Sequence, residues 1–234
     1  MNYGIIAAGE GSRLVQEGIS LPKPLVKLHG KEMLGRLIDI FLVNDAQSIS
    51  IIVNEEMQQV QEYVKTLRLP VPLNLVVKST PSSMHSFFEL RDFFRAGKFC
   101  LTTVDTIFEE ADFKAYIDAF SGSDQIDGLM AVTSYIDDEK PLYVETDGEM
   151  NITGFLDKAY NCPYISGGIY GLTPKALDTL EACIHSEQSR MRNFQRQLIA
   201  DGLRLKAYPF GKIIDVDHAA DIVVAEEFLN TTLK

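Results

Sequence analysis

Apolar positions along the chain follow two periods, one typical of strands and the other of helices. Short apolar runs predict strands at 3–8, 48–53, 73–77, 99–104 and 129–135. Apolar residues at helical spacing predict helices between them, at 33–43, 57–67, 84–94 and 113–120. Strands that alternate with helices in this way favour a parallel sheet covered by helices on both faces.

The pattern changes in the middle of the chain. From 141 to about 172, short strands follow one another around the pairs Asp147-Gly148 and Gly167-Gly168, which predicts a small antiparallel insertion. Helices are predicted again at 174–184, 191–199 and 219–229, with strands at 203–208 and 212–216. There is no internal repeat or linker. We therefore expect one α/β domain over residues 1–234, with a doubly wound, mostly parallel, Rossmann-like sheet.

Composition narrows the possible partners. The formal net charge of −11, from 33 acidic and 22 basic side chains, opposes binding to nucleic acid through its phosphates. The three cysteines are far apart in sequence, which argues against a disulfide framework or a thiolate metal site. No apolar run reaches the roughly 18 residues of a membrane helix, and the first residues lack the basic start of a secretory signal. The sequence predicts a cytoplasmic protein without nucleic-acid or membrane partners, and it leaves the oligomeric state open.

A glycine-rich loop follows the first strand. Residues 9–13 read Gly-Glu-Gly-Ser-Arg, and Lys23 lies between two prolines shortly afterwards. Glycines let backbone N–H groups approach phosphate oxygens closely, while Arg13 and Lys23 supply positive charge. A tight turn with surface charges has the same composition, and the loop matches neither a Walker A motif nor a dinucleotide fingerprint. Taken by itself, the loop leaves both interpretations open.

The wider stretch resembles the nucleotidyltransferase family that includes the sugar-nucleotide pyrophosphorylases. The family pattern is Gly-x-Gly-Ser/Thr-Arg-Leu, then Pro-Lys-Pro-Leu, then Gly-Lys-Pro. Here the three parts read Gly-Glu-Gly-Ser-Arg-Leu at 9–14, Pro-Lys-Pro-Leu at 22–25 and Gly-Lys-Glu at 30–32. The resemblance implies a GT-A-like nucleotidyltransferase fold, with a nucleotide-binding half at about 1–135, an acceptor-binding half at about 136–215 and a C-terminal helix at 216–234.

The resemblance also implies roles for individual residues. Arg13 and Lys23 would be catalytic, stabilising the charge that develops on the α-phosphate and the leaving pyrophosphate. Small residues would bind the nucleoside triphosphate, namely Ala8, Gly9, Gly11, Ser12 and Ser83. Serine is also a common N-cap residue, so the residue types equally predict that Ser82 or Ser83 caps the helix that follows.

Two aspartates are the candidate metal ligands. Asp105 follows a predicted strand, where a carboxylate either holds a metal or caps the next turn. Residues 104–108, Val-Asp-Thr-Ile-Phe, resemble the family's Gly-Asp-x-x-Phe, which implies Mg²⁺ binding by Asp105. The ending Asp-Val-Asp at 215–217 resembles the family's second acidic motif. We expect Asp215 to be the second ligand and Asp217 to cap the last helix, with a shared metal role for Asp217 as the alternative.

The acceptor is less well defined. Asp157-Lys158 resembles a Glu-Lys pair of the family, and residues 167–170 resemble its Asn-x-Gly-Ile-Tyr strand, which implies acceptor contacts from Lys158 and Gly168. Ser166 and Gly167 replace the asparagine that often binds a sugar. A sugar 1-phosphate is the expected acceptor. The alternatives are choline phosphate, as in bacterial cytidylyltransferases, and a catalytically silent nucleotide-binding regulatory module.

Overall fold

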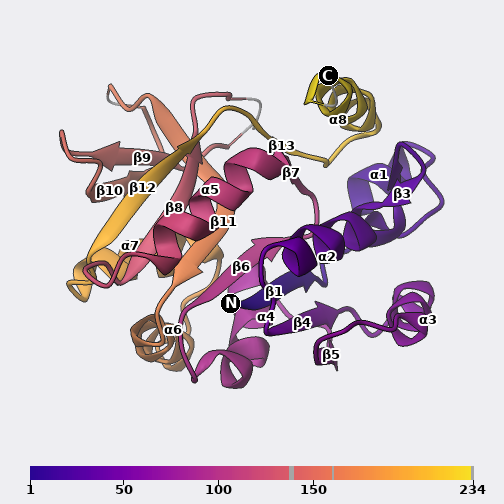
Figure 1. Ribbon diagram of the computed structural model, residues 1–234, viewed down its shortest axis with the longest axis horizontal. Helices are drawn as coiled ribbons and strands as arrows, with labels where there is room; N and C mark the ends of the chain where they lie inside the picture. Colours follow the sequence, from indigo (N-terminus) through magenta and orange to yellow (C-terminus); the bar gives the residue numbers. More distant parts are fainter. Residues whose placement is uncertain (137–139, 160, 233–234) are drawn as a thin grey trace.

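A nine-stranded mixed sheet runs through the molecule in this computed structural model, which describes residues 1–136, 140–159 and 161–232 (Figure 1). The main path of the sheet is β10-β9-β11-β6-β1-β4-β5, and β8 joins β11 to β12. The strands of this sheet are β1 (Asn2–Ala7), β4 (Ser48–Val53), β5 (Leu73–Val77), β6 (Phe99–Thr103), β8 (Gly128–Thr133), β9 (Tyr143–Thr146), β10 (Ile152–Leu156), β11 (Tyr164–Leu172) and β12 (Leu205–Phe210).

Helices and two small ladders complete the chain. The helices are α1 (Ser12–Gln16), α2 (Met33–Val43), α3 (Gln58–Thr66), α4 (Ser83–Leu90), α5 (Glu110–Ser121), α6 (Lys175–His185), α7 (Met191–Ala200) and α8 (Ala219–Thr232). The ladders pair β2 (Lys27–Leu28) with β3 (Lys31–Glu32), and β7 (Thr106–Phe108) with β13 (Ile213–Asp215). Short 3₁₀ turns lie at Lys23–Leu25 and Arg91–Phe94.

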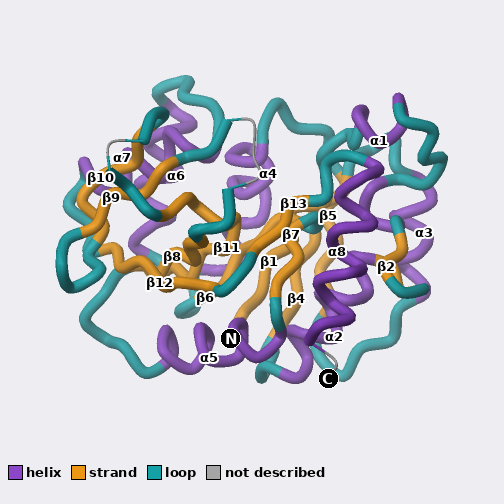
Figure 2. The backbone as a smooth tube through the Cα atoms, turned by 90° about the horizontal axis from the view of Figure 1, so that it is seen from above, coloured by secondary structure: helices purple, strands orange, loops and turns teal. Residues whose placement is uncertain are grey.

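The sheet is the middle of three layers. Figure 2 shows α2 and α5 on one side of it and α4, α6 and α7 on the other. The side chains of β1 alternate between the two faces: Tyr3, Ile5 and Ala7 join the core beneath α2 and α5, and Ile6 joins the opposite core. Both faces of β1 are therefore apolar, as expected for a strand covered by helices on each side.

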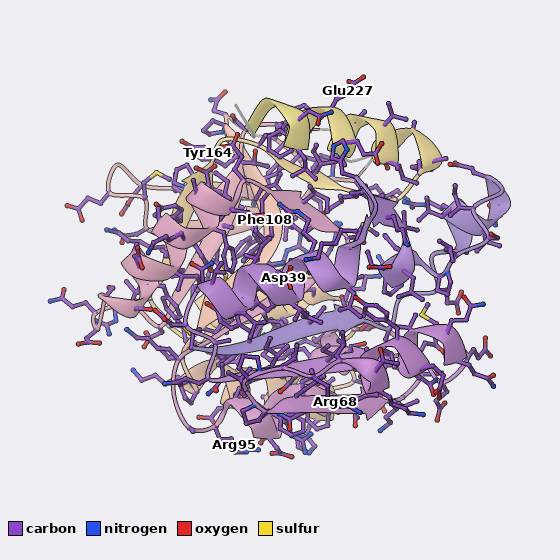
Figure 3. All side chains as sticks on the ribbon, turned by 45° about the vertical axis from the view of Figure 1, so that its right-hand side comes forward. Asp39, Arg68, Arg95, Phe108, Tyr164 and Glu227 are labelled. Atoms are coloured by element: carbon purple, nitrogen blue, oxygen red, sulfur yellow. The ribbon has the colours of Figure 1, made fainter. Side chains whose placement is uncertain are left out.

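The interior and the surface differ in the expected way. Phe108 is fully buried, whereas charged side chains such as Arg68, Arg95 and Glu227 lie on the outside (Figure 3). No helix among residues 1–136, 140–159 and 161–232 combines the length and the apolar character needed to cross a membrane.

The predicted fold class is confirmed, and several boundaries match the sequence pattern. The helix predicted at 33–43 and the strands predicted at 48–53 and 73–77 have the same bounds in the structure. Strands β6, β1, β4 and β5 are parallel neighbours. The helix predicted at 84–94 ends at Leu90 and continues as a 3₁₀ turn. The prediction for 136–215 includes 137–139 and 160, and that for 216–234 includes 233–234, all of which lie outside the described residues.

The predicted antiparallel insertion is part of the main sheet. Strand β11 runs antiparallel between β6 and β8. Strand β9 pairs with the first residues of β11, and β10 pairs with β9 at the edge of the sheet. Strand β12 returns parallel to β8. The insertion therefore continues the central sheet directly from β6.

A small ladder brings the end of the chain to Asp105. Asp215 pairs with Thr106 in the antiparallel register of β13 and β7. One step further on, the N–H of Val216 donates to the carbonyl of Asp105 at 3.1 Å. This register places two segments that are more than a hundred residues apart in sequence beside each other.

Candidate active site

A cavity of about 600 Å³ opens at the end of β1. Every residue predicted to bind the nucleotide lines it: Ala8, Gly9, Gly11, Ser12 and Ser83. Arg13, Lys23, Asp105 and Asp217 line it as well. The glycine-rich loop, its lysine and two of the three candidate metal ligands thus share one cavity.

Glycine suits positions 9 and 11 of the loop for two different structural reasons. Gly11 has a φ of 62° and caps the start of α1, where a Cβ would lie 3.0 Å from Cβ of Lys23. Gly9 has no heavy atom within 4 Å of the position where its Cβ would be. The open space beside Gly9 is cavity, so a ligand can approach the backbone there without meeting a side chain.

Lys23 is the central cation of the site. Its side chain is 9% exposed, and Nζ donates to Oδ1 of Asp217 at 2.6 Å and to Oδ2 of Asp105. Burial by itself would lower the pKa of Lys23, but Asp105 and Asp217 raise it above its ordinary value. Lys23 therefore stays charged, and it holds the two carboxylates in place.

Asp217 does not have the predicted capping role. Its Oδ2 accepts from Nη1 of Arg13 at 3.0 Å while its Oδ1 accepts from Lys23. At the start of α8, Asp221 accepts from the N–H of His218 at 2.7 Å and Glu17 accepts from the N–H of Ala219 at 2.6 Å. The prediction of Asp217 as the cap is wrong because two other carboxylates reach these N–H groups, and Asp217 faces the cavity instead.

Asp215 lies in a crowded negative environment. Asp215 is an exposed residue, and desolvation by the protein packed around its carboxyl group is the largest cause that raises its pKa above the ordinary value. The negative charge of Asp105 acts in the same direction, while Lys23 opposes it. Asp215 and Asp217 would lie on one face of a strand only if the strand continued through both residues. Strand β13 ends at Asp215, so Asp217 lies beyond it.

This donor set fits Mg²⁺. Carboxylate oxygens are hard ligands, and a divalent cation would relieve the repulsion that raises the pKa of Asp215. No three His, Cys, Asp or Glu side chains of the described chain are grouped closely enough to hold a metal by themselves. Mg²⁺ commonly binds through one or two carboxylates and takes its remaining ligands from substrate phosphates and water.

A second cavity, of about 320 Å³, adjoins the first. Both are lined by Ser83, Thr103, Asp105 and Asp217, and the second also by Asp215 and Gly168. The acidic residues thus lie at the junction of two chambers. This is the arrangement that a reaction between two bound substrates requires.

The two predicted acceptor residues have different positions. Gly168 lines the second cavity with a φ of 73°, and a Cβ there would lie 3.1 Å from Oγ1 of Thr106. Lys158 is exposed and does not line this cavity; it lines a neighbouring hollow that shares Lys140 and Arg192 with it. The structure therefore brings Gly168 to the carboxylates but leaves Lys158 apart from them.

The predicted helix cap is correct in position only. Ser82 is the N-cap residue of α4, but its hydroxyl contacts Nδ1 of His85 at 2.9 Å and makes no hydrogen bond to the helix backbone. It also accepts from the N–H of Arg190 at 3.3 Å. Ser82 thus ties the start of α4 to the start of α7, and Ser83 is left facing both cavities.

Sequence reasoning missed part of both chambers. Asn54, Ser79 and Thr80 line the first cavity, and Lys140, Arg190, Arg192 and Gln195 line the second. One signal was available: Gln195 is a polar residue on the apolar stripe of a predicted helix. Arg190, a non-glycine residue with a φ of 74°, has a strained backbone that no sequence pattern reveals.

Solved structures share this fold. An inositol-1-phosphate CTP transferase from T. maritima has a TM-score of 0.82 and 22% identity, covering 100% of this chain and 96% of that one. A putative glucose-1-phosphate thymidylyltransferase from Bacillus anthracis has a TM-score of 0.84 and 18% identity, covering 97% and 94%. HddC from Yersinia pseudotuberculosis has a TM-score of 0.75 and 20% identity, covering 97% and 99%.

Curated relatives are longer than this chain. The bifunctional protein GlmU of Methanococcus maripaludis (strain C7 / ATCC BAA-1331) is 25% identical over 244 aligned residues, which cover 98% of this chain. The chain spans 55% of that protein's length. The GlmU of Neisseria meningitidis serogroup C (strain 053442) is 38% identical over 65 residues, or 28% of this chain and 14% of that protein. The model of the nucleotidyl transferase family matches residues 4–230. The chain belongs to the nucleotidyl transferase family.

Proposed function

We propose that this protein transfers a nucleoside monophosphate from a nucleoside triphosphate to a sugar 1-phosphate and releases pyrophosphate. The observation that carries the proposal is the junction of the two cavities, where Asp105 and Asp217 line both cavities and each contacts Lys23. The glycine-rich loop lines the first cavity only, which supports the first as the triphosphate chamber and the second as the acceptor chamber.

The residues support a reaction without a protein nucleophile. An oxygen of the acceptor phosphate attacks the α-phosphorus, and the bond from that phosphorus to the bridging oxygen of pyrophosphate breaks. The acceptor phosphate is already ionised, so no general base is needed. Arg13 and Lys23 stabilise the charge on the α-phosphate and the leaving group. Mg²⁺ held by Asp105 and Asp215 would neutralise and orient the triphosphate oxygens.

The second cavity favours an anionic, oxygen-rich acceptor over choline phosphate. Lys140, Arg190 and Arg192 line it, and among the described residues Tyr170 is its single aromatic lining residue. Proteins commonly bind a quaternary ammonium group in cages of several aromatic rings, and the single ring of Tyr170 does not make such a cage. The similar structures named for inositol 1-phosphate and glucose 1-phosphate support the same choice of acceptor class.

The test is a matrix of pyrophosphate release. The four common triphosphates are combined with hexose 1-phosphates, inositol 1-phosphate and choline phosphate, in the presence of Mg²⁺. We expect turnover with one sugar 1-phosphate and its loss in Asp105→Asn. Turnover with choline phosphate alone would identify the cytidylyltransferase alternative. Triphosphate binding without any turnover would favour the regulatory module.

A further inference from the structure

Gln195 is a polar side chain on the buried face of α7. The residues that share this face are apolar: Met191, Phe194 and Leu198. Gln195 itself is 2% exposed, which is as little as its apolar neighbours. A carboxamide in such a position is costly to bury unless both its ends find hydrogen-bond partners.

One end of the carboxamide is fixed. Oγ of Ser166 donates to Oε1 of Gln195 at 3.0 Å. The Nε2 group has no hydrogen-bond partner within residues 1–136, 140–159 and 161–232, and Gln195 lines the second cavity. The free end of the side chain is therefore a donor that can be satisfied by an oxygen atom of a bound molecule.

Ser166 is itself held firmly. Its N–H donates to the carbonyl of Leu142 at 2.9 Å, and it pairs with Val132 in the β11–β8 ladder. Ser166, Tyr170 and Asp215 line the same cavity as Gln195, so the carboxamide and the carboxylates border one space.

Gln195 also lies on a different element from the amide that the family resemblance leads one to expect. Ser166 and Gly167 stand at the β11 positions where an asparagine is usual. Without a Cβ, Gly167 makes room for Ile213, whose Cδ1 would lie 2.3 Å from it. The carboxamide of Gln195 on α7, oriented by Ser166, therefore lies at the cavity beside β11, the strand that has no asparagine at these positions.

We propose that Gln195, positioned by Ser166, selects the acceptor by donating a hydrogen bond from Nε2 to an oxygen of the acceptor's body. The inference rests on the proposed function and adds the substrate class: a polyol phosphate with a hydroxyl group that reaches Gln195. A molecule without such an oxygen leaves a buried donor unpaired, and this penalty is the source of the selectivity.

The test compares acceptors that differ by one oxygen. The probes are the hexose 1-phosphate with the fastest turnover and its four monodeoxy analogues, assayed with wild type, Gln195→Met, Ser166→Ala and Gln197→Met. Gln197 is the matched control because it lies on the same helix and its amide donates to Asp201 at 2.6 Å, away from the cavity. Thermal melting shows whether each variant is folded.

We expect wild type and Gln197→Met to lose about tenfold in kcat/KM with one deoxy analogue. In Gln195→Met this preference should disappear, with the KM for the triphosphate unchanged. In Ser166→Ala the preference should shrink because the carboxamide is no longer oriented. The change should appear in the KM for the acceptor, and kcat should change little. If a variant fails to fold, the comparison of the hexose 1-phosphate with its deoxy analogues in the wild type still tests the proposal.

Different outcomes overturn different statements. If turnover occurs and wild type accepts every deoxy analogue equally well, the role of Gln195 is wrong and the proposed function stands. Preference retained in Gln195→Met would have the same consequence. If no phosphorylated acceptor turns over at all, the proposed function fails and the selection role fails with it.

Discussion

The ammonium group of Lys23 lies 2.6 Å from Oδ1 of Asp217, a residue 194 positions further along the chain. The same group contacts Asp105, and Asp217 also accepts from Arg13. The cations expected to bind phosphate are thus neutralised by the acidic residues of the site. A divalent metal bound to those carboxylates would take over this neutralisation, and Lys23 and Arg13 would then be available to the triphosphate.

Replacing Lys23 tests its role in charge stabilisation. In Lys23→Met we expect kcat to fall by roughly 10²–10³-fold, the usual cost of losing one group that stabilises a charged transition state. The measurement is pyrophosphate release with the best substrate pair. Lys27→Met is the control, because Lys27 is an exposed lysine paired with Glu32 at 3.3 Å. Equal activity in both variants would remove Lys23 from the site.

Metal binding distinguishes the roles of the aspartates. We expect Asp105→Asn and Asp215→Asn to weaken Mn²⁺ binding by about tenfold or more, and Asp217→Asn to weaken it less. In wild type the affinity should rise with pH, because Asp215, whose pKa is raised above its ordinary value, must lose its proton to bind a cation. Mn²⁺ titrations followed by electron paramagnetic resonance measure both effects. Loss of binding in Asp217→Asn alone would reassign the second ligand.

Gly168 is expected to tolerate no side chain. With its φ of 73°, and Oγ1 of Thr106 3.1 Å from the position of a Cβ, Gly168→Ala should lower the free energy of unfolding by about 1–2 kcal/mol. Gly148→Ala is the control, because it has no positive φ and its Cβ position is open. Urea unfolding of the two variants gives the comparison. Similar stabilities would show that the conformation of Gly168 carries no cost for an alanine.

Asp127 gives a pH-dependent contribution to stability. It is buried at the start of β8 and accepts from Nζ of Lys175 and from the N–H of Arg204, both at 2.9 Å. Burial would raise its pKa, but the hydrogen bond from Arg204 and then Lys175 hold it below the ordinary value. The stabilisation is therefore present above the ordinary carboxylate pKa of about 4 and is lost as the pH falls through the lower, folded-state pKa.

The Asp127→Asn variant measures this contribution. We expect it to unfold about 1–2 kcal/mol more easily at pH 7, and the difference from wild type to shrink at about pH 3. Asp124→Asn is the control, because the Asp124 side chain is 97% exposed and its pair with Lys98 is open to water. Denaturant unfolding at both pH values provides the data. A difference that does not depend on pH would assign the effect to packing.

Secondary structure was predictable where local patterns are strong. The helix Met33–Val43 has a regular apolar stripe, and the strand Ser48–Val53 has β-branched residues at four of its six positions. Such elements form from neighbouring positions in sequence, so period and composition identify them. The order of the sheet was less accessible: the position of β11 between β6 and β8 depends on contacts between residues distant in sequence.

The sequence by itself determined the family, and it pointed to the glycine-rich loop and to Arg13, Lys23 and Asp105 as candidate site residues, because these lie in short motifs with fixed spacing. Only the tertiary structure decided the partners of Asp217, the separation of Lys158 from the carboxylates and the position of Gln195 in the second cavity. The physical reason is the same in each case. A side chain's partners depend on which distant strands and helices pack together, and those long-range contacts leave no regular period in the sequence.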